Sequence, residues 1–248
     1  HVVNYKGTFD ECVISRFCGG YLKGETPNPC IDCNRFLKFD ALQKRRKELG
    51  YDYVATGHYA RRVFNKQLGK YELHRGLDPK KDQSYVLYHL SQEQLAHMLF
   101  PLGELSKEEV RELAHKAGLR TADKLESQDI CFVPDGNYAA FIEDYTGKKL
   151  EPGPILDEQG KELGTHHGLA RYTLAAGEPL FVLEKDIERN ALIVGPASSM
   201  GVQEVIADDI NLITLDSIDE PLTVEAKVNY RAKPQKATAE IVDNILHV

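Results

Sequence analysis

The stretch Tyr53-Val54-Ala55-Thr56-Gly57-His58 decides the fold. It is a short apolar run that ends in glycine and histidine, which is typical of a buried strand. A helical pattern over residues 36–49 precedes it and ends at Gly50. A helix followed by such a strand indicates a parallel α/β sheet, in which ligands bind at the carboxyl ends of the strands. The sequence therefore predicts an α/β domain with Gly57 and His58 at its ligand-binding edge.

The pattern of residues changes after about Gly136. Before this point, Phe9–Leu22 has helical spacing and 61–75 has the pattern of a hairpin. Ser91 and Ser106 each precede a helical run with Gln or Glu three residues later, which is a capping-box pattern. After Gly136, glycines, prolines and short alternating runs predict β-structure. We expect a Rossmann-like α/β domain over 1–138, a small central, mostly β domain over 139–202, and an incomplete C-terminal β-barrel over 203–248.

The composition limits the classes of function. No run of about 18 apolar residues occurs, so no membrane span is expected. The net charge of −7 argues against a protein that wraps nucleic acid, but it allows a local basic patch. One short stretch is rich in cations, either as such a patch or as a solvated helix face. Its members are Arg35, Lys38, Lys44, Arg45, Arg46 and Lys47.

Five cysteines, an odd number, favour a reducing cytoplasm over a disulfide-stapled secreted domain. Cys30 and Cys33 form a C-x-x-C pair after Thr26-Pro27-Asn28-Pro29, which we expect to be a rigid loop, with the next helix starting near Asn34. Such a pair is compatible with half a zinc site, a redox pair, iron–sulfur ligands or coincidence. No second C-x-x-C pair is present to complete a zinc site.

The other three cysteines lie among apolar residues. Cys131 follows Ser127-Gln128-Asp129-Ile130, so its neighbours indicate a polar rim, although a lone cysteine beside Ile and Phe is more often part of a core. Cys12 and Cys18 fall on the expected helix and are interpreted as structural. The run Lys81-Asp82-Gln83-Ser84-Tyr85 combines groups that contact phosphates or bases, or it is a polar turn before a strand.

Taken together, these segments resemble the tRNA-specific 2-thiouridylases, a family of pyrophosphatase-loop ATPases. The resemblance extends in order over nearly the whole chain. The matching segments are Thr26–Asn34, Ala55–Ala60, Lys81–Tyr85, Glu126–Phe132, Gly164–Tyr172 and Tyr230-Arg231.

The resemblance implies a fold, a reaction and a set of site residues. ATP with Mg²⁺ adenylates the 2-oxygen of the wobble uridine in the tRNA anticodon stem-loop, and sulfur then arrives from a cysteine persulfide. A partner such as a cysteine desulfurase or a sulfur-relay protein supplies the sulfur. Cys33 resembles the nucleophile, Cys131 the persulfide carrier and Gly57 an ATP contact. The implied tRNA contacts are Asn28, Pro29, Cys30, Lys81, Asp82, Gln83, Tyr230 and Arg231.

Three features depart from the family. The glycine-rich phosphate loop is absent, and Val2-Val3 resembles the end of a buried strand, so we expect the N-terminal part of the α/β domain to precede His1. A basic glycine-rich stretch is absent between Leu174 and Ala175, where we expect a gap in the chain. Cys30 stands where some members have Asp, so Cys30, Cys33 and Cys131 are also compatible with a 4Fe–4S cluster.

Two alternatives and two expectations follow from these features. The alternatives are a tRNA-binding module without catalysis and another adenylating enzyme of the same fold, which needs no paired cysteines. We expect Cys33 and Cys131 to lie on one cleft wall. We also expect tRNA affinity to fall with salt, because phosphate contacts release counterions.

Overall fold

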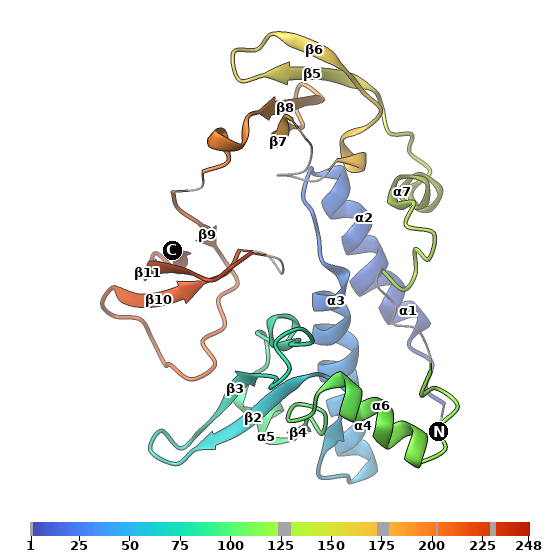
Figure 1. Ribbon diagram of the computed structural model, residues 1–248, viewed down its shortest axis with the longest axis vertical. Helices are drawn as coiled ribbons and strands as arrows, with labels where there is room; N and C mark the ends of the chain where they lie inside the picture. Colours follow the sequence, from blue (N-terminus) through green and yellow to red (C-terminus); the bar gives the residue numbers. More distant parts are fainter. Residues whose placement is uncertain (1, 124–129, 173–178, 202, 229–231) are drawn as a thin grey trace. The chain divides into compact units, whose positions relative to one another are not determined.

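The computed structural model describes residues 2–123, 130–172, 179–201, 203–228 and 232–248. They divide into two compact units, each built from two separate stretches of chain (Figure 1). The first unit comprises His1–Cys33 and Glu126–Val202, and the second comprises Asn34–Leu125 and Gln203–Val248. Within the described ranges, no helix is both long and apolar enough to span a membrane.

The first unit begins with a helical segment that runs from Lys6 to Leu22. It consists of α1 (Lys6–Phe9), the π-helical η1 (Asp10–Ile14) and α2 (Ser15–Leu22). The predicted helix over Phe9–Leu22 is therefore confirmed, with a start three residues earlier. Its buried face carries Val13, Phe17, Cys18 and Tyr21.

Residues 2–5 do not match the expectation of a buried strand. They form no strand, and the side chains of Val2 and Val3 are 101% and 44% exposed. A strand needs a hydrogen-bonded neighbour, and no described strand pairs with these residues. The prediction that they end a buried strand is wrong for this structure.

A second helical segment runs without interruption from Pro29 to Leu49. It consists of α3 (Pro29–Asp32), the π-helical η2 (Cys33–Ala41) and α4 (Leu42–Leu49), and Gly50 ends it at φ +70°. The predicted start near Asn34 is wrong, because proline is accepted at the first helical position, where no N–H partner is required. Cys30 and Cys33 consequently lie on a helix rather than in a loop.

The second unit contains the strand predicted at residues 53–57. β1 (Val54–Ala55) pairs in parallel with β4 (Met98–Leu99), and the predicted hairpin consists of β2 (Ala60–Asn65) and β3 (Lys70–Arg75). The short 3₁₀ turn η3 (Ser84–Val86) follows the hairpin. Both predicted capping boxes are present, at α5 (Gln92–Ala96) and α6 (Lys107–Lys116).

A glycine allows the loop after β4 to approach β2 closely. A Cβ atom built on Gly103 would lie 1.9 Å from the carbonyl oxygen of Ala60. The amide of Leu77 donates to the Gly103 carbonyl oxygen at 2.9 Å. The loop therefore depends on the absence of a side chain at this position, and it keeps the hairpin in place beside β4.

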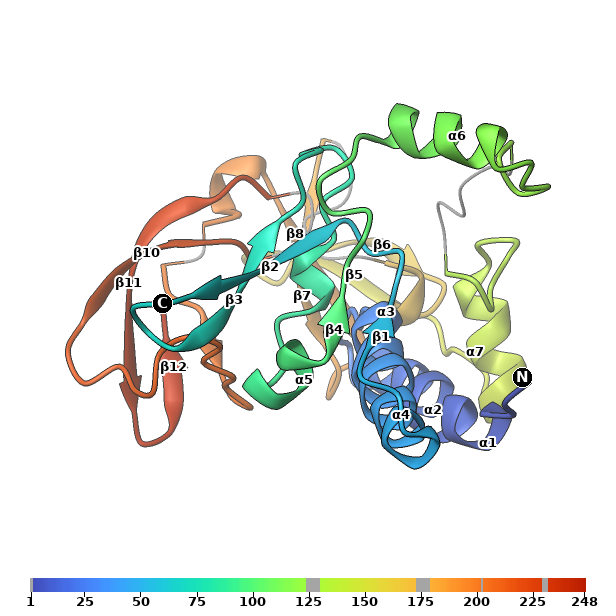
Figure 2. The same ribbon diagram turned by 90° about the horizontal axis from the view of Figure 1, so that it is seen from below.

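The remainder of the first unit is a helix and a four-stranded sheet. α7 (Tyr138–Thr146) lies beside α2 in both views of the chain (Figures 1 and 2). The sheet has the order β6-β5-β8-β7, with β5 and β8 parallel and the other neighbours antiparallel. Its strands are β5 (Gly153–Asp157), β6 (Glu162–His166), β7 (Phe181–Asp186) and β8 (Ala191–Gly195). Two 3₁₀ turns, η4 (Leu169–Arg171) and η5 (Ala197–Ser199), flank β7 and β8.

The C-terminal residues form a second four-stranded sheet, with the order β10-β11-β12-β9. The strands are β9 (Ile206–Ala207), β10 (Leu222–Ala226), β11 (Gln235–Val242) and β12 (Ile245–His247), all in antiparallel pairs. The alternation predicted at Leu222–Val228 is thus confirmed as a strand. The chain as a whole contains mixed sheets with parallel strands, and the three predicted domain boundaries remain predictions.

Candidate functional site

The segment that carries Cys30 and Cys33 is organised by a local cap. The side-chain oxygen of Asn28 accepts a hydrogen bond from the amide of Cys30 at 3.1 Å, and Pro29 is buried at the first helical position. Cys30 is exposed and Cys33 is half-buried. Asn28 therefore fixes the start of the helix on which both thiols are carried. Its predicted contact with the target base remains a prediction.

The segment that carries Cys131 is held by aromatic rings. Cys131 is exposed, while the ring of its neighbour Phe132 makes edge contacts with Phe9 and Phe17 at centroid distances of 5.7 and 5.3 Å. Phe132 also contacts Phe141 of α7 at 5.4 Å. The thiol thus faces solvent while its backbone is anchored on a hydrophobic cluster. The predicted role of Cys131 as persulfide carrier remains a prediction.

Both cysteine segments pack against the same helical segment, Lys6–Leu22. α3 lies against η1, and Arg16 of α2 forms an ion pair with Asp32 at 3.3 Å. Phe132 lies on the aromatic residues of the same segment. The two segments therefore share one support. The expectation that the thiols of Cys33 and Cys131 share a cleft wall remains a prediction.

The two cysteines interpreted as structural lie on the helix itself. Cys18 is buried, and burial, together with the negative charge of Asp10, raises the pKa of its thiol to about 11. Such a thiol stays protonated at neutral pH and is a poor nucleophile. Cys12 is half-buried.

A metal cluster has no support in this geometry. In the parts of the chain that the structure describes, no three His, Cys, Asp or Glu side chains gather closely enough to hold a metal ion. Cys30, Cys33 and Cys131 all belong to those parts. The three thiols therefore do not fit a 4Fe–4S cluster in this structure.

Gly57 lies where the fold places ligands, directly after the parallel strand β1. It is exposed, and a Cβ built on it would make only an ordinary contact of 3.5 Å with Leu102. The described structure would thus tolerate a side chain at this position, and the predicted contact of Gly57 with ATP remains a prediction. Next to it, His58 is buried and bonds Thr56 at 2.8 Å. Burial, helped by Lys38, lowers the pKa of His58 to about 4, so the ring is neutral.

Two residues of the Lys81–Gln83 turn accept hydrogen bonds from backbone amides of the protein, which the sequence did not predict. The carboxylate of Asp82 accepts hydrogen bonds from the backbone amides of Gly76 and Ser84, each at 3.1 Å. The side-chain oxygen of Gln83 accepts from the Tyr59 amide at 3.2 Å. Asp82 and Gln83 therefore hold this turn beside the start of β2. Direct contacts of Lys81, Asp82 and Gln83 with tRNA remain predictions.

The basic stretch of the long helix does not act as one patch. Arg46 is 8% exposed and donates to the side chain of Gln43 and to the carbonyl oxygens of Tyr51 and Asp52. It stabilises the end of α4, so its guanidinium belongs neither to an exposed basic patch nor to a solvated helix face. Three other cations of the stretch form ion pairs with carboxylates: Arg35 with Asp209, Arg45 with Glu48, and Lys47 with Glu93.

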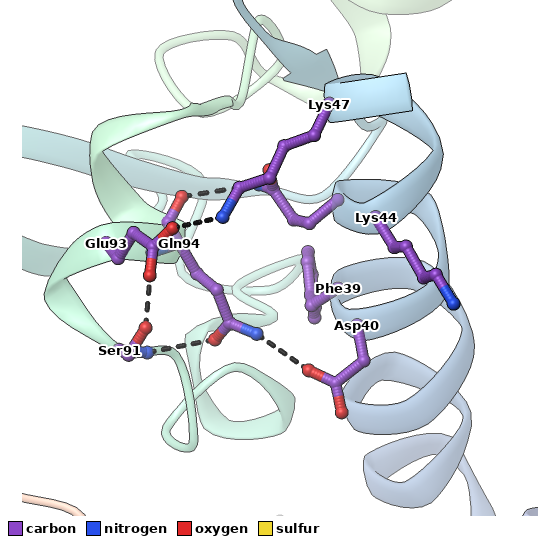
Figure 3. Close-up of a pocket in the computed structure, with 8 residues that line it drawn as sticks. Phe39, Asp40, Lys44, Lys47, Ser91, Glu93 and Gln94 are labelled. Atoms are coloured by element: carbon purple, nitrogen blue, oxygen red, sulfur yellow. Dashed lines mark hydrogen bonds and ion pairs between the residues drawn. The ribbon is translucent and has the colours of Figure 1, made fainter. Parts of the chain in front are cut away.

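A hollow between η2, α4 and the start of α5 shows the same self-pairing (Figure 3). Lys47 forms an ion pair with Glu93 at 2.5 Å, and the side-chain amide of Gln94 donates to the carboxylate of Asp40 at 2.8 Å. Lys44 points away from these pairs. Polar groups of α4 and η2 thus bond across this hollow to groups of α5 and join the two sides.

Some predicted positions lie outside the described residues. Tyr230 and Arg231 are two of them, and the junction of Leu174 and Ala175 is another. The structure also reveals residues that the sequence reasoning missed. The clearest is Asp209, which pairs with Arg35 across 174 positions of sequence and carries no local signal.

Comparison with known proteins defines first the class of protein. A model described as "tRNA methyl transferase HUP domain" matches residues 1–135, and one described as "tRNA methyl transferase PRC-barrel domain" matches residues 139–196. The protein thus combines a HUP domain, which is Rossmann-like, with a PRC-barrel domain.

The relatives are more specific. The chain is 48% identical to the tRNA-specific 2-thiouridylase MnmA of Carboxydothermus hydrogenoformans, over 97% of this chain and 68% of the relative. It is 48% identical to the protein of the same name from Moorella thermoacetica (96% and 69%), and 42% to that from Clostridioides difficile (96% and 68%). This chain belongs to the tRNA-specific 2-thiouridylase family.

Proposed function

We propose that this protein is an ATP-dependent tRNA-uridine 2-sulfurtransferase that replaces the 2-oxygen of the wobble uridine (U34) with sulfur. The observation that carries the proposal is the pair of cysteine segments, Cys30–Cys33 and Cys131, supported by one helix in a chain 48% identical to a named 2-thiouridylase. A binding module without catalysis would need neither the exposed thiol of Cys131 nor the capped helix of Cys33.

The two thiols have different roles in this proposal. Cys131 is exposed, so a sulfur-donor protein, such as a cysteine desulfurase or a relay protein, reaches it and leaves a persulfide. Cys33 is half-buried on a helix that Asn28 caps, so its position is fixed relative to the substrate. Asn28 and Cys30 border the target base, and the buried Pro29 shapes the backbone that presents them.

Every bond formed and broken in the proposed sulfur transfer is accounted for by ATP, the uridine and the two cysteines, without a metal. ATP, when bound with Mg²⁺, would supply the adenylyl group that turns the 2-oxygen of uridine into a leaving group, with release of pyrophosphate. The terminal sulfur of the Cys131 persulfide forms the new bond to the base, and AMP departs. Cys33 then attacks the Sγ of Cys131, which breaks the S–S bond to the base-bound sulfur and leaves a Cys33–Cys131 disulfide. A thiol reductant restores both cysteines, as a cytoplasmic setting allows.

The finer architecture belongs to the same proposal. Residues 1–138 form the nucleotide-binding domain, with Gly57 contacting ATP, and residues 139–202 form the small central domain. Residues 203–248 form part of a C-terminal β-barrel that contacts tRNA through Tyr230 and Arg231. The Lys81–Gln83 turn provides the remaining tRNA contacts.

The test is direct. The full-length gene product is incubated with an unmodified tRNA transcript, ATP, a cysteine desulfurase and cysteine, and the tRNA nucleosides are analysed by mass spectrometry. We expect 2-thiouridine at the wobble position, with one AMP released per modified base. ATP-independent binding of tRNA with no thiolated base would support the binding module instead.

A further inference from the structure

A segment between β9 and β10, here called the strap (Asp209–Asp216), is attached to the α/β part of the second unit. Its attachments include hydrogen bonds between neutral groups. Asn211 donates to the carbonyl oxygen of Tyr88 at 2.6 Å, and Gln92 donates to the carbonyl oxygen of Ile213 at 2.7 Å. These bonds join side chains to the backbone and carry no net charge.

Two ion pairs lie at the two ends of the strap. Asp209 pairs with Arg35 of η2 at 2.5 Å, and Asp216 pairs with Lys70 of β3 at 2.6 Å. The carboxylates are 68% and 92% exposed, whereas the cations are 38% and 24% exposed. Each carboxylate thus approaches its cation from the solvent side, where a solute anion would also arrive.

Two other arginines of this unit are held differently. Arg46 donates to the backbone carbonyl oxygens of Tyr51 and Asp52, and Arg62 donates to those of Leu95 and Ala96. Arginines held by backbone oxygens stabilise the fold and cannot leave without a cost to it. The guanidinium of Arg35 and the ammonium of Lys70 each have a carboxylate partner, whose charge resembles that of a phosphate oxygen. Lys70 also donates to the carbonyl oxygen of Thr214 at 3.1 Å, and that oxygen belongs to the strap and leaves with it.

We propose that Asp209 and Asp216 of the strap occupy two RNA phosphate sites, and that Arg35 and Lys70 bind backbone phosphates of tRNA when those carboxylates are displaced. This inference rests on the proposed tRNA substrate and adds two contacts and an autoinhibitory segment to it. Because one segment supplies both carboxylates, a single displacement exposes both cations together.

The exchange is energetically inexpensive. Exposed ion pairs contribute little to stability, so the protein loses little when the carboxylates leave. Phosphate oxygens then provide equivalent charge-assisted bonds, and arginine matches them with its planar donor geometry. In a chain with a net charge of −7, such masking also reduces binding of unrelated anions.

The test measures tRNA affinity as a function of salt for the full-length protein and for Asp209→Asn/Asp216→Asn. The variant keeps the neutral strap bonds, including the bond from Lys70 to the Thr214 carbonyl oxygen, but removes both carboxylates that pair with the cations. We expect affinity to rise by about 2- to 30-fold at low salt. For the variant, the slope of log affinity against log salt should be steeper by about one to two. In the parent protein, the displaced carboxylates take up cations from solution and so reduce the net release of counterions, and the variant lacks these carboxylates.

A matched control separates unmasking from added positive charge. Glu48→Gln/Glu93→Gln makes the same change in net charge and releases Arg45 and Lys47, but it leaves the strap intact. This control should change the salt slope by less than the strap variant does. In an Arg35→Gln/Lys70→Gln background, the strap substitutions should have no larger effect than the control substitutions do.

The possible outcomes separate the two proposals. If the parent protein does not bind tRNA, the proposed function fails. If the parent binds and the strap variant has the same affinity and salt slope, the strap inference is overturned. An equal response of the strap variant and the control overturns it as well, because charge alone would then explain the gain.

Discussion

The two cysteine segments are held in place by different kinds of interaction. The start of the helix at Pro29 is fixed locally, by one hydrogen bond from the Cys30 amide to the Asn28 side chain and by the restricted backbone of proline. The segment at Cys131 is fixed by tertiary contacts, through rings of Phe132, Phe9 and Phe17 that are distant in sequence. The thiol proposed to act at the base is thus carried on a capped helix, and the thiol proposed to receive sulfur from another protein is exposed beside a hydrophobic anchor.

The comparison predicts that both thiols are essential despite these different surroundings. Cys33→Ser and Cys131→Ser should each lower the rate of 2-thiouridine formation by at least about 100-fold, because neither covalent step has a substitute. Nucleoside mass spectrometry of the tRNA product measures this rate. Cys12→Ser is the matched control and should keep most of the activity, and a Cys33 variant of normal rate would remove Cys33 from the reaction.

Removing the aromatic anchor should harm stability and sulfur transfer together. Phe132→Ala deletes a half-buried ring with three aromatic neighbours, and we expect the free energy of unfolding to fall by about 2 kcal/mol. Chemical denaturation measures this change. Phe64→Ala is the control, since its ring is 49% exposed and should cost much less. Equal losses for the two variants would contradict the anchoring role of Phe132.

The local cap should have a smaller effect. Asn28→Ala leaves the amide of Cys30 without its side-chain acceptor and should lower stability by about 1 kcal/mol. Asn28→Ser retains a capping oxygen but removes the amide group, so it separates capping from base recognition. If the serine variant is stable yet slow in thiolation, Asn28 acts on the base. If both variants are stable, the cap contributes nothing.

The smallest effect concerns a lysine behind the aromatic cluster. The ammonium of Lys185 on β7 is buried without a hydrogen-bond partner in the described structure, and lies 5.8 Å from the centre of the Tyr21 ring. Burial lowers the pKa of Lys185, so the unfolded chain holds this proton more tightly than the folded chain does. Stability should therefore rise with pH between the lowered pKa and the ordinary value of lysine.

Lys185→Met tests this account, because it removes the titrating group and keeps the side-chain length. We expect a gain of a few tenths of a kcal/mol to about 1 kcal/mol at neutral pH and a flatter stability curve in that alkaline interval. Denaturation at several pH values measures both. A variant that is less stable at neutral pH would show that the contact with Tyr21 outweighs the burial cost.

The sequence predicted those parts of the fold that depend on local signals. The caps at Ser91 and Ser106 are predictable because their partners lie three residues away, and the hairpin over 61–75 is predictable from its pattern. The start of the second helix was missed because the prolines of Thr26–Pro29 were interpreted only as helix breakers. Pairs such as Arg35 and Asp209 were beyond prediction, since only the folded chain brings them together. The roles of Arg46, Asp82 and Gln83 in holding the fold were hidden for the same reason.

We propose that the exposed Cys131 carries the transferred sulfur as a persulfide, and that Cys33 then releases the thiolated base by forming a disulfide with Cys131. The most direct measurement is peptide mass spectrometry of the full-length protein after incubation with a cysteine desulfurase and cysteine, with no tRNA present. We predict one added sulfur atom on the Cys131 peptide, in the parent protein and in Cys33→Ser alike, and none in Cys131→Ser. Added sulfur on Cys33, or persulfide formation that survives Cys131→Ser, would contradict this division of roles.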